Sequence, residues 1–107
     1  MTSTRSSDPR ERRIEDRDAL CDALLQLKNR GEAERFLKDL CTPGEIEALA
    51  ERWRVVRLLD AGGKTYRQIA EETGASTATV TRVARFLMQE PNEGYRLVLD
   101  RLKGGKQ

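Results

Sequence analysis

Residues 65–87, TYRQIAEETGASTATVTRVARFL, constrain the fold of this chain more than any other stretch. The segment begins with Thr65, and Gln68 follows three residues later, which is the pattern of a capping box at a helix start. Gly74 near the middle can adopt the left-handed backbone conformation that a tight turn requires. Small and apolar residues fall where two short helices would touch, namely Ile69, Ala70, Val80 and Val83. The spacing predicts a helix-turn-helix over about residues 65–88, whose second helix enters the DNA major groove.

The second helix of this motif presents small polar and basic side chains on its first turns. No acidic residue occurs from Thr73 to Gln89, and Ser76 or Thr77 is placed to cap the helix. A helix N-terminus favours phosphate, and short hydroxyl and methyl side chains allow a close approach to base edges. We therefore expect a DNA-binding surface, with a solvated polar helix as the alternative interpretation. The residues expected to form this surface are Lys64, Arg67, Ser76, Thr77, Ala78, Thr79, Thr81, Arg82 and Arg85.

Four further helices are expected around the motif. Apolar residues recur at helical spacing from Ile14 to Lys28, where Asn29-Arg30-Gly31 is expected to end the helix, and again up to Cys41. Thr42-Pro43-Gly44-Glu45 indicates the start of a long helix, and the last helix follows Pro91-Asn92. No strand pattern competes with these helices. The sequence predicts an all-α chain of six helices, with a disordered tail over residues 1–13 and one helical domain for DNA binding and dimerisation over residues 14–104.

The composition argues against an enzyme and against a metal site. The chain has no histidine, so the commonest acid–base residue is absent and a tetrahedral zinc site lacks ligands. No serine or cysteine has a visible base nearby, and no glycine-rich phosphate loop occurs. Cys21 and Cys41 lie on apolar stripes and are expected to be reduced core residues, with a redox switch as the alternative.

The balance of charged and apolar residues bears on partners and location. The net charge of the 107 residues is only +2, so nucleic-acid binding has to depend on local placement of basic residues. With 37% hydrophobic and 36% charged residues, the chain is expected to complete its core by pairing with a second copy. No apolar run approaches the ~20 residues that span a bilayer, and the N-terminus lacks the apolar centre of a signal peptide. We expect a cytoplasmic protein without a membrane partner.

Residues 41–87 resemble the core of the Trp repressor superfamily. The most specific part is GASTATVTR at residues 74–82, and TPGEIEAL and ERWRVV extend the likeness over roughly residues 15–103. Within the superfamily, the chain resembles the YerC/YecD-type Trp-repressor-related proteins. The resemblance implies a six-helix fold in an intertwined two-fold homodimer, whose two helix-turn-helix units face successive major grooves.

The same resemblance implies where a ligand would bind. In the Trp repressor, tryptophan binds between the long central helix and the recognition helix, and the pocket residues match Thr42, Arg52 and Arg82 here. Where the family has a small glycine and a small serine, this chain has Val83 and Phe86. We expect these two residues to fill the pocket, so that no small-molecule co-repressor or other cofactor is required. Arg52 as a surface ion-pair partner is the alternative interpretation.

The expected function is that of a sequence-specific DNA-binding transcriptional regulator, a repressor that binds double-stranded DNA as a homodimer and is not controlled by tryptophan. Two alternatives stay open at this point. One is a protein-interaction module on a helix-turn-helix scaffold, because fold does not fix function. The other is a sensor for a small ligand other than tryptophan, bound through the retained arginines.

Overall fold

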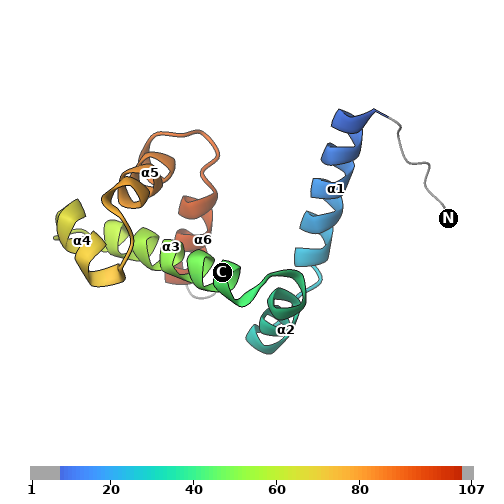
Figure 1. Cartoon of the computed structure of the whole chain (residues 1–107), viewed down its shortest axis with the longest axis horizontal. Coiled ribbons are helices and arrows are strands. Elements are labelled where there is room, and N and C mark those ends of the chain that lie inside the picture. The colour runs from blue at the N-terminus through green and yellow to red at the C-terminus, as the bar shows by residue number, and fades with distance from the viewer. Residues whose placement is uncertain (1–7, 105–107) are drawn as a thin grey trace. The chain divides into compact units, whose positions relative to one another are not determined.

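The computed structural model of the chain describes residues 8–104, and these residues form six α-helices and no strand (Figure 1). The all-α, six-helix architecture predicted from the sequence is confirmed. The helices are α1 (Pro9–Leu24), α2 (Arg30–Leu40), α3 (Pro43–Ala61), α4 (Tyr66–Thr73), α5 (Thr77–Met88) and α6 (Gly94–Gly104).

The chain divides between Thr42 and Pro43 into two compact units. Helices α1 and α2 belong to the first unit, and α3 to α6 belong to the second. The single domain expected over residues 14–104 therefore stays a prediction.

Helix α1 begins earlier and ends earlier than the sequence predicts. The Asp8 carboxylate accepts a hydrogen bond from the Arg10 amide at 2.9 Å, and Pro9 occupies the first helical position. The predicted tail over residues 1–13 is thus wrong for residues 9–13, and residues 1–7 lie outside the described residues. At the other end the helix stops at Leu24.

Asn29 starts α2 and does not end α1. Its side-chain oxygen accepts a hydrogen bond from the Glu32 amide at 2.9 Å, so Arg30 and Gly31 lie in the first turn of α2. The predicted stop at Asn29-Arg30-Gly31 is therefore wrong. The physical reason is that asparagine caps a helix start as well as it tolerates a helix end.

The first unit contains no buried residue on either of its helices. Large apolar side chains remain exposed along it, namely Ile14, Leu20, Leu24, Leu25 and Leu40. Cys21 is exposed and Cys41 is half-buried, and both are free thiols. The expectation that both cysteines are core residues is wrong for Cys21, because α1 buries nothing within this chain.

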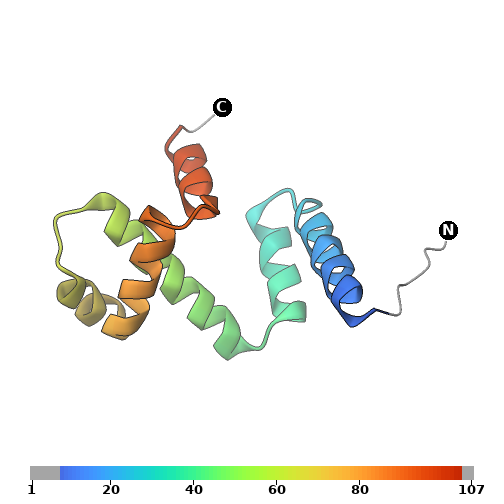
Figure 2. The same ribbon diagram turned by 90° about the horizontal axis from the view of Figure 1, so that it is seen from above.

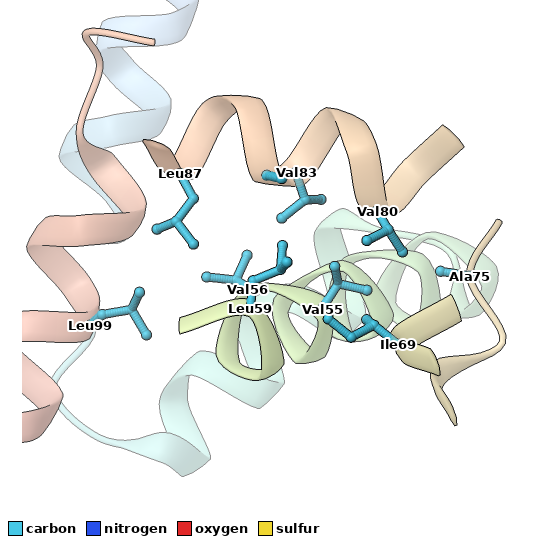
Figure 3. Packing of buried hydrophobic residues seen from close by; sticks show 10 residues of the cluster. Val55, Val56, Leu59, Ile69, Ala75, Val80, Val83, Leu87 and Leu99 are labelled. Carbon is cyan, nitrogen blue, oxygen red and sulfur yellow. The ribbon is translucent and has the colours of Figure 1, made fainter. Parts of the chain in front are cut away.

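The second unit has an apolar core between α3 and α5 (Figure 3). Val80, Val83 and Leu87 of α5 point toward the face of α3 that carries Val55, Val56 and Leu59, as Figure 3 shows. Ile69 of α4 and Leu99 of α6 complete the core from its two ends. Figure 2 shows α4 and α5 beside α3, with α6 after the end of α5. This core fixes which face of α5 remains outside.

An ion-pair cluster joins α6 to α3. The Asp60 carboxylate accepts a hydrogen bond from Arg96 Nη1 at 2.9 Å, and Lys103 Nζ lies 2.7 Å from its other oxygen. These two cations, Lys103 above all, lower the pKa of Asp60 below its ordinary value of 3.8. The hydrogen bond to Asp60 in turn raises the pKa of Arg96.

Candidate nucleic-acid interface

The turn between α4 and α5 has the geometry that the sequence predicts. The Thr65 hydroxyl accepts from the Gln68 amide at 3.1 Å, and the Gln68 side chain accepts from the Thr65 amide at 2.8 Å. Gly74 has a φ of 85°, which is the left-handed region. The capping box and the left-handed glycine are therefore confirmed, and together they set the direction in which α5 leaves α4.

The Thr73 side chain makes two hydrogen bonds at this turn that the spacing of residues in the sequence did not predict. Its hydroxyl donates to the carbonyl oxygen of Ile69 at 2.8 Å and accepts from the amide of Ala75 at 3.1 Å. One side chain thus binds the last turn of α4 and the residue after Gly74. In the sequence, only the presence of a threonine at the end of a helix indicates that its hydroxyl can make these hydrogen bonds.

Ser76 is the cap of α5. Its hydroxyl oxygen accepts a hydrogen bond from the Thr79 amide at 3.0 Å, and the two hydroxyl groups of Ser76 and Thr79 are hydrogen-bonded at 3.1 Å. The cap leaves the amides at the start of α5 directed outward, where they favour an anion.

The outer face of α5 brings together the residues expected to contact DNA. A hollow of about 480 Å³ on this face is lined by Thr77, Ala78, Thr81, Arg82 and Arg85. All five are exposed, while Val80, Val83, Ala84 and Leu87 of the same helix are buried. The core thus holds one side of α5, and the predicted polar and basic side remains accessible. Thr79 is half-buried at the edge of this face.

Two of the expected cations are held by carboxylates. Lys64 Nζ lies 3.3 Å from Glu72 Oε1, and Arg85 Nε lies 3.5 Å from Glu90 Oε2. Neither pair follows the i, i+4 spacing that indicates a helical ion pair, so their positions in the sequence did not predict them. Arg67 lies exposed in the first turn of α4 and makes no ion pair with any carboxylate among residues 8–104.

Arg82 contacts an aromatic ring, whereas Lys64 and Arg85 pair with carboxylates. Its guanidinium carbon lies 4.5 Å from the centroid of the Phe86 ring, and that of Arg85 lies 5.9 Å from the same ring. Phe86 is half-buried, and it lines a hollow of about 330 Å³ at the α5–α6 junction with Arg82, Asn92, Gly94 and Tyr95. The face of a guanidinium stacks favourably on such a ring, so this contact holds Arg82 without a carboxylate.

Sequence comparison identifies the family. A family model described as the Trp repressor protein matches residues 15–103. The chain belongs to the Trp repressor family. It is 49% identical over 86 residues to the uncharacterized protein YerC of Bacillus subtilis, across 80% of this chain and 81% of YerC. It is 39% identical over 69 residues to a Trp operon repressor homolog of Chlamydia trachomatis, across 61% of this chain and 73% of that protein.

Comparison of structures agrees with the sequence match. A crystal structure of a TrpR-like protein from Eubacterium eligens superposes with a TM-score of 0.73 at 45% identity, covering 80% of this chain and 87% of that one. The fold is therefore that of a family of DNA-binding regulators, and the Trp repressor resemblance predicted from the sequence is confirmed.

The residues matched to the family's tryptophan pocket lie in different surroundings. Thr42 is the last residue of the first unit, and Arg52 is half-buried on α3. Arg52 makes no ion pair with any carboxylate among residues 8–104, so the structure does not support its interpretation as an ion-pair partner. Val83 is 1% exposed in the core between α3 and α5, and Phe86 lies under Arg82.

Within the part of the chain that the structure describes, no helix is long and apolar enough to cross a membrane. No group of three or more cysteine, aspartate and glutamate side chains within residues 8–104 is placed to hold a metal ion.

Proposed function

We propose that the protein is a sequence-specific DNA-binding regulator that acts as a homodimer and represses by occupying promoter DNA. The observation that carries this proposal is the outer face of α5, where five exposed side chains, none of them acidic, line one hollow. Arginine contributes phosphate contacts, and short threonine and alanine side chains allow an approach to base edges.

The helix N-terminus strengthens the same proposal. Ser76 caps α5 with a neutral hydroxyl, so the positive end of the helix dipole is not cancelled by an acidic cap. In a helix-turn-helix, the N-terminal residues of the second helix contact the bases. Thr77 and Ala78 occupy that position here.

Homodimerisation would explain why the helices of the first unit leave apolar side chains exposed. Neither α1 nor α2 buries a residue, while Leu20 and Leu24 of α1 stay exposed within this chain. A second copy of the chain that covers these side chains would supply the missing core. A two-fold dimer also presents two α5 helices to one duplex.

The alternative of a protein-interaction module has less support. Such a module needs an apolar patch on the accessible face of its binding helix. Among the described residues of α5, Met88 is the one large apolar side chain that is exposed, and it lies at the C-terminal end of the helix. The outer face of α5 is otherwise polar and basic.

Control by tryptophan is not part of the proposed function. The Phe86 ring lies directly under Arg82, one of the two arginines matched to the family's ligand pocket. We therefore expect calorimetry of the purified protein with L-tryptophan to show no saturable heat in the micromolar range. Saturable heat in that range would refute this part of the proposal.

Binding of selected DNA by substituted proteins tests the proposal. Arg82→Ala should weaken binding to every duplex and lower the slope of log affinity against log salt by about 1 for each phosphate that Arg82 neutralises. Thr79→Ala should change the preferred sequence. Arg101→Ala removes the same charge from α6 and serves as the matched control. A double variant Thr79→Ala/Arg82→Ala that binds as tightly as the wild type would contradict the proposal.

A further inference from the structure

Phe86 is the aromatic side chain that contacts the cations of the α5 outer face. Its ring centroid lies 4.5 Å from the Arg82 guanidinium carbon and 5.9 Å from that of Arg85. Both distances fall within the range of about 6 Å over which a cation is attracted to a ring face. One ring therefore serves two of the arginines expected to contact DNA.

The two arginines differ in what else they bind. Arg85 Nε forms an ion pair with Glu90 Oε2 at 3.5 Å, so a phosphate has to displace that carboxylate to use this edge of the guanidinium. Arg82 makes no ion pair with any carboxylate among residues 8–104. A contact with a ring uses the charge of the guanidinium and none of its N–H groups as hydrogen-bond donors to a carboxylate, so these groups can donate to a phosphate. Arg82 can therefore bind an anion without losing a partner.

The Phe86 ring of α5 faces the start of α6. It lines the same hollow as Tyr95 of α6. The Tyr95 ring contacts the Trp53 ring of α3, with centroids 6.2 Å apart, and both rings pack against the core. Asp60 of α3 holds α6 through Arg96 and Lys103. The platform under Arg82 thus lies on a helix, half-buried beside Tyr95, and not on a surface loop.

We propose that Phe86 is a positioning residue for DNA binding: its ring holds the Arg82 guanidinium by one face and directs the N–H groups of Arg82 to a DNA phosphate. This inference rests on the proposed function, because it assigns a role within the same surface. Phe86 itself does not contact DNA. The ring fixes a side chain that would otherwise lose rotamer freedom on binding, and less entropy is then lost when the phosphate contact forms.

The test measures the affinity of the full-length protein for a mixed-sequence DNA duplex by fluorescence anisotropy at low salt. Phe86→Leu keeps apolar volume and removes the aromatic face, so we expect affinity to fall by about 2–5-fold for each helix-turn-helix, and by about 4–25-fold for a dimer with both engaged. Phe86→Tyr keeps the aromatic face and should restore most of the affinity. Thermal unfolding of each variant establishes that the measured protein is folded.

A double-mutant cycle separates positioning from a merely structural role. In the Arg82→Ala background, Phe86→Leu should cost less than about twofold, because the cation that the ring holds is gone. An equal loss in both backgrounds would overturn the inference, since the ring would then act through the fold. Wild-type affinity in Phe86→Leu would overturn it as well.

A measurement without DNA keeps the two proposals distinguishable. In the wild type, the side-chain protons of Arg82 should show an upfield NMR shift from the Phe86 ring, and Phe86→Leu should abolish that shift. Absence of the shift in the wild type overturns the inference whatever the DNA result. If the shift is present and the wild type does not bind the duplex, the proposed function fails and the role of Phe86 in DNA binding fails with it.

Discussion

Gly74 is the single residue on which the direction of α5 depends most. Its φ of 85° lies in the left-handed region, and an added Cβ would meet Glu51 Oε2 at 3.4 Å. We expect Gly74→Ala to lower the free energy of unfolding by about 1–2 kcal/mol, since that is the cost of left-handed backbone for an L side chain. Chemical denaturation measures this loss directly.

Gly44 is the matched control for that substitution. It lies in the first turn of α3, its φ is not positive, and nothing lies within 4 Å of an added Cβ. Gly44→Ala should be neutral or stabilise the protein by up to about 1 kcal/mol, because alanine loses less backbone freedom in a helix. Equal stability of the Gly74→Ala and Gly44→Ala variants would contradict the role assigned to Gly74.

For single residues, backbone roles can be predicted from the sequence better than side-chain partners. The Thr65 capping box and the Gly74 turn depend on local backbone needs, so their spacing was sufficient to predict them. Asn29 was misassigned because one residue type serves at both ends of helices. The stacking of Arg82 on Phe86 could not be predicted, because i, i+4 spacing brings the two residues near each other without deciding which partner a cation takes.

Among the helices, α6 depends on one carboxylate of α3. The side chain of Asp60 is 12% exposed and binds both Arg96 and Lys103. Its pKa is lowered in the folded protein, so its contribution to stability is fully present above its ordinary value of 3.8 and is lost as the pH falls through the lowered pKa. We expect Asp60→Asn to lower the Tm at neutral pH, and the difference from the wild type to close in acid.

Thermal unfolding of both proteins across this pH range checks the prediction. Asp100→Asn is the control, because Asp100 lies 3.7 Å from the same Arg96 but is 61% exposed, and exposed pairs contribute little. A difference between Asp60→Asn and the wild type that stays constant with pH would show that the charge of Asp60 is not what holds α6.

The elements themselves were predicted with uneven success. The four helices of the second unit follow the sequence closely, because their apolar stripes pack within the same chain. Helix α1 was placed wrongly at both ends, since no buried face marks where it begins and stops. The Asp60 cluster was missed because its partners lie 36 and 43 residues away along the chain.

For the whole molecule, the exposed leucines of the first unit determine whether two copies associate. Leu24 of α1 is 45% exposed within this chain, and Leu20 lies one turn before it. If a second copy covers this face, Leu24→Lys places an unpaired charge in the interface and should convert the dimer to a monomer with a lower Tm. Sedimentation and light scattering report the mass.

The matched control for this change is Asp22→Lys, which places the same side chain on an exposed position of the same helix. It should leave the mass unchanged. A wild-type protein that is already a monomer at micromolar concentration would refute the dimer, and so would a Leu24→Lys protein that keeps the wild-type mass.

Only part of the organisation of the whole chain could be predicted from the sequence. The low apolar content predicts a core that needs a second copy, and pairing stays a prediction. Within the described residues, neither helix of the first unit has a buried residue. The division at Thr42 was not expected, because helical periodicity continues on both sides of it. The spacing of apolar residues shows which face of a helix is apolar. The division into compact units depends instead on which of these faces pack against each other.

Selection of bound duplexes from a random DNA pool by the wild-type protein tests whether two α5 helices of a dimer bind specific DNA sequences together. We expect enrichment of one short motif in two inverted copies, whose centres lie about 34–36 Å apart, because a two-fold dimer presents its two α5 helices one helical turn from each other. A pool that shows no enriched motif at low salt would contradict this expectation.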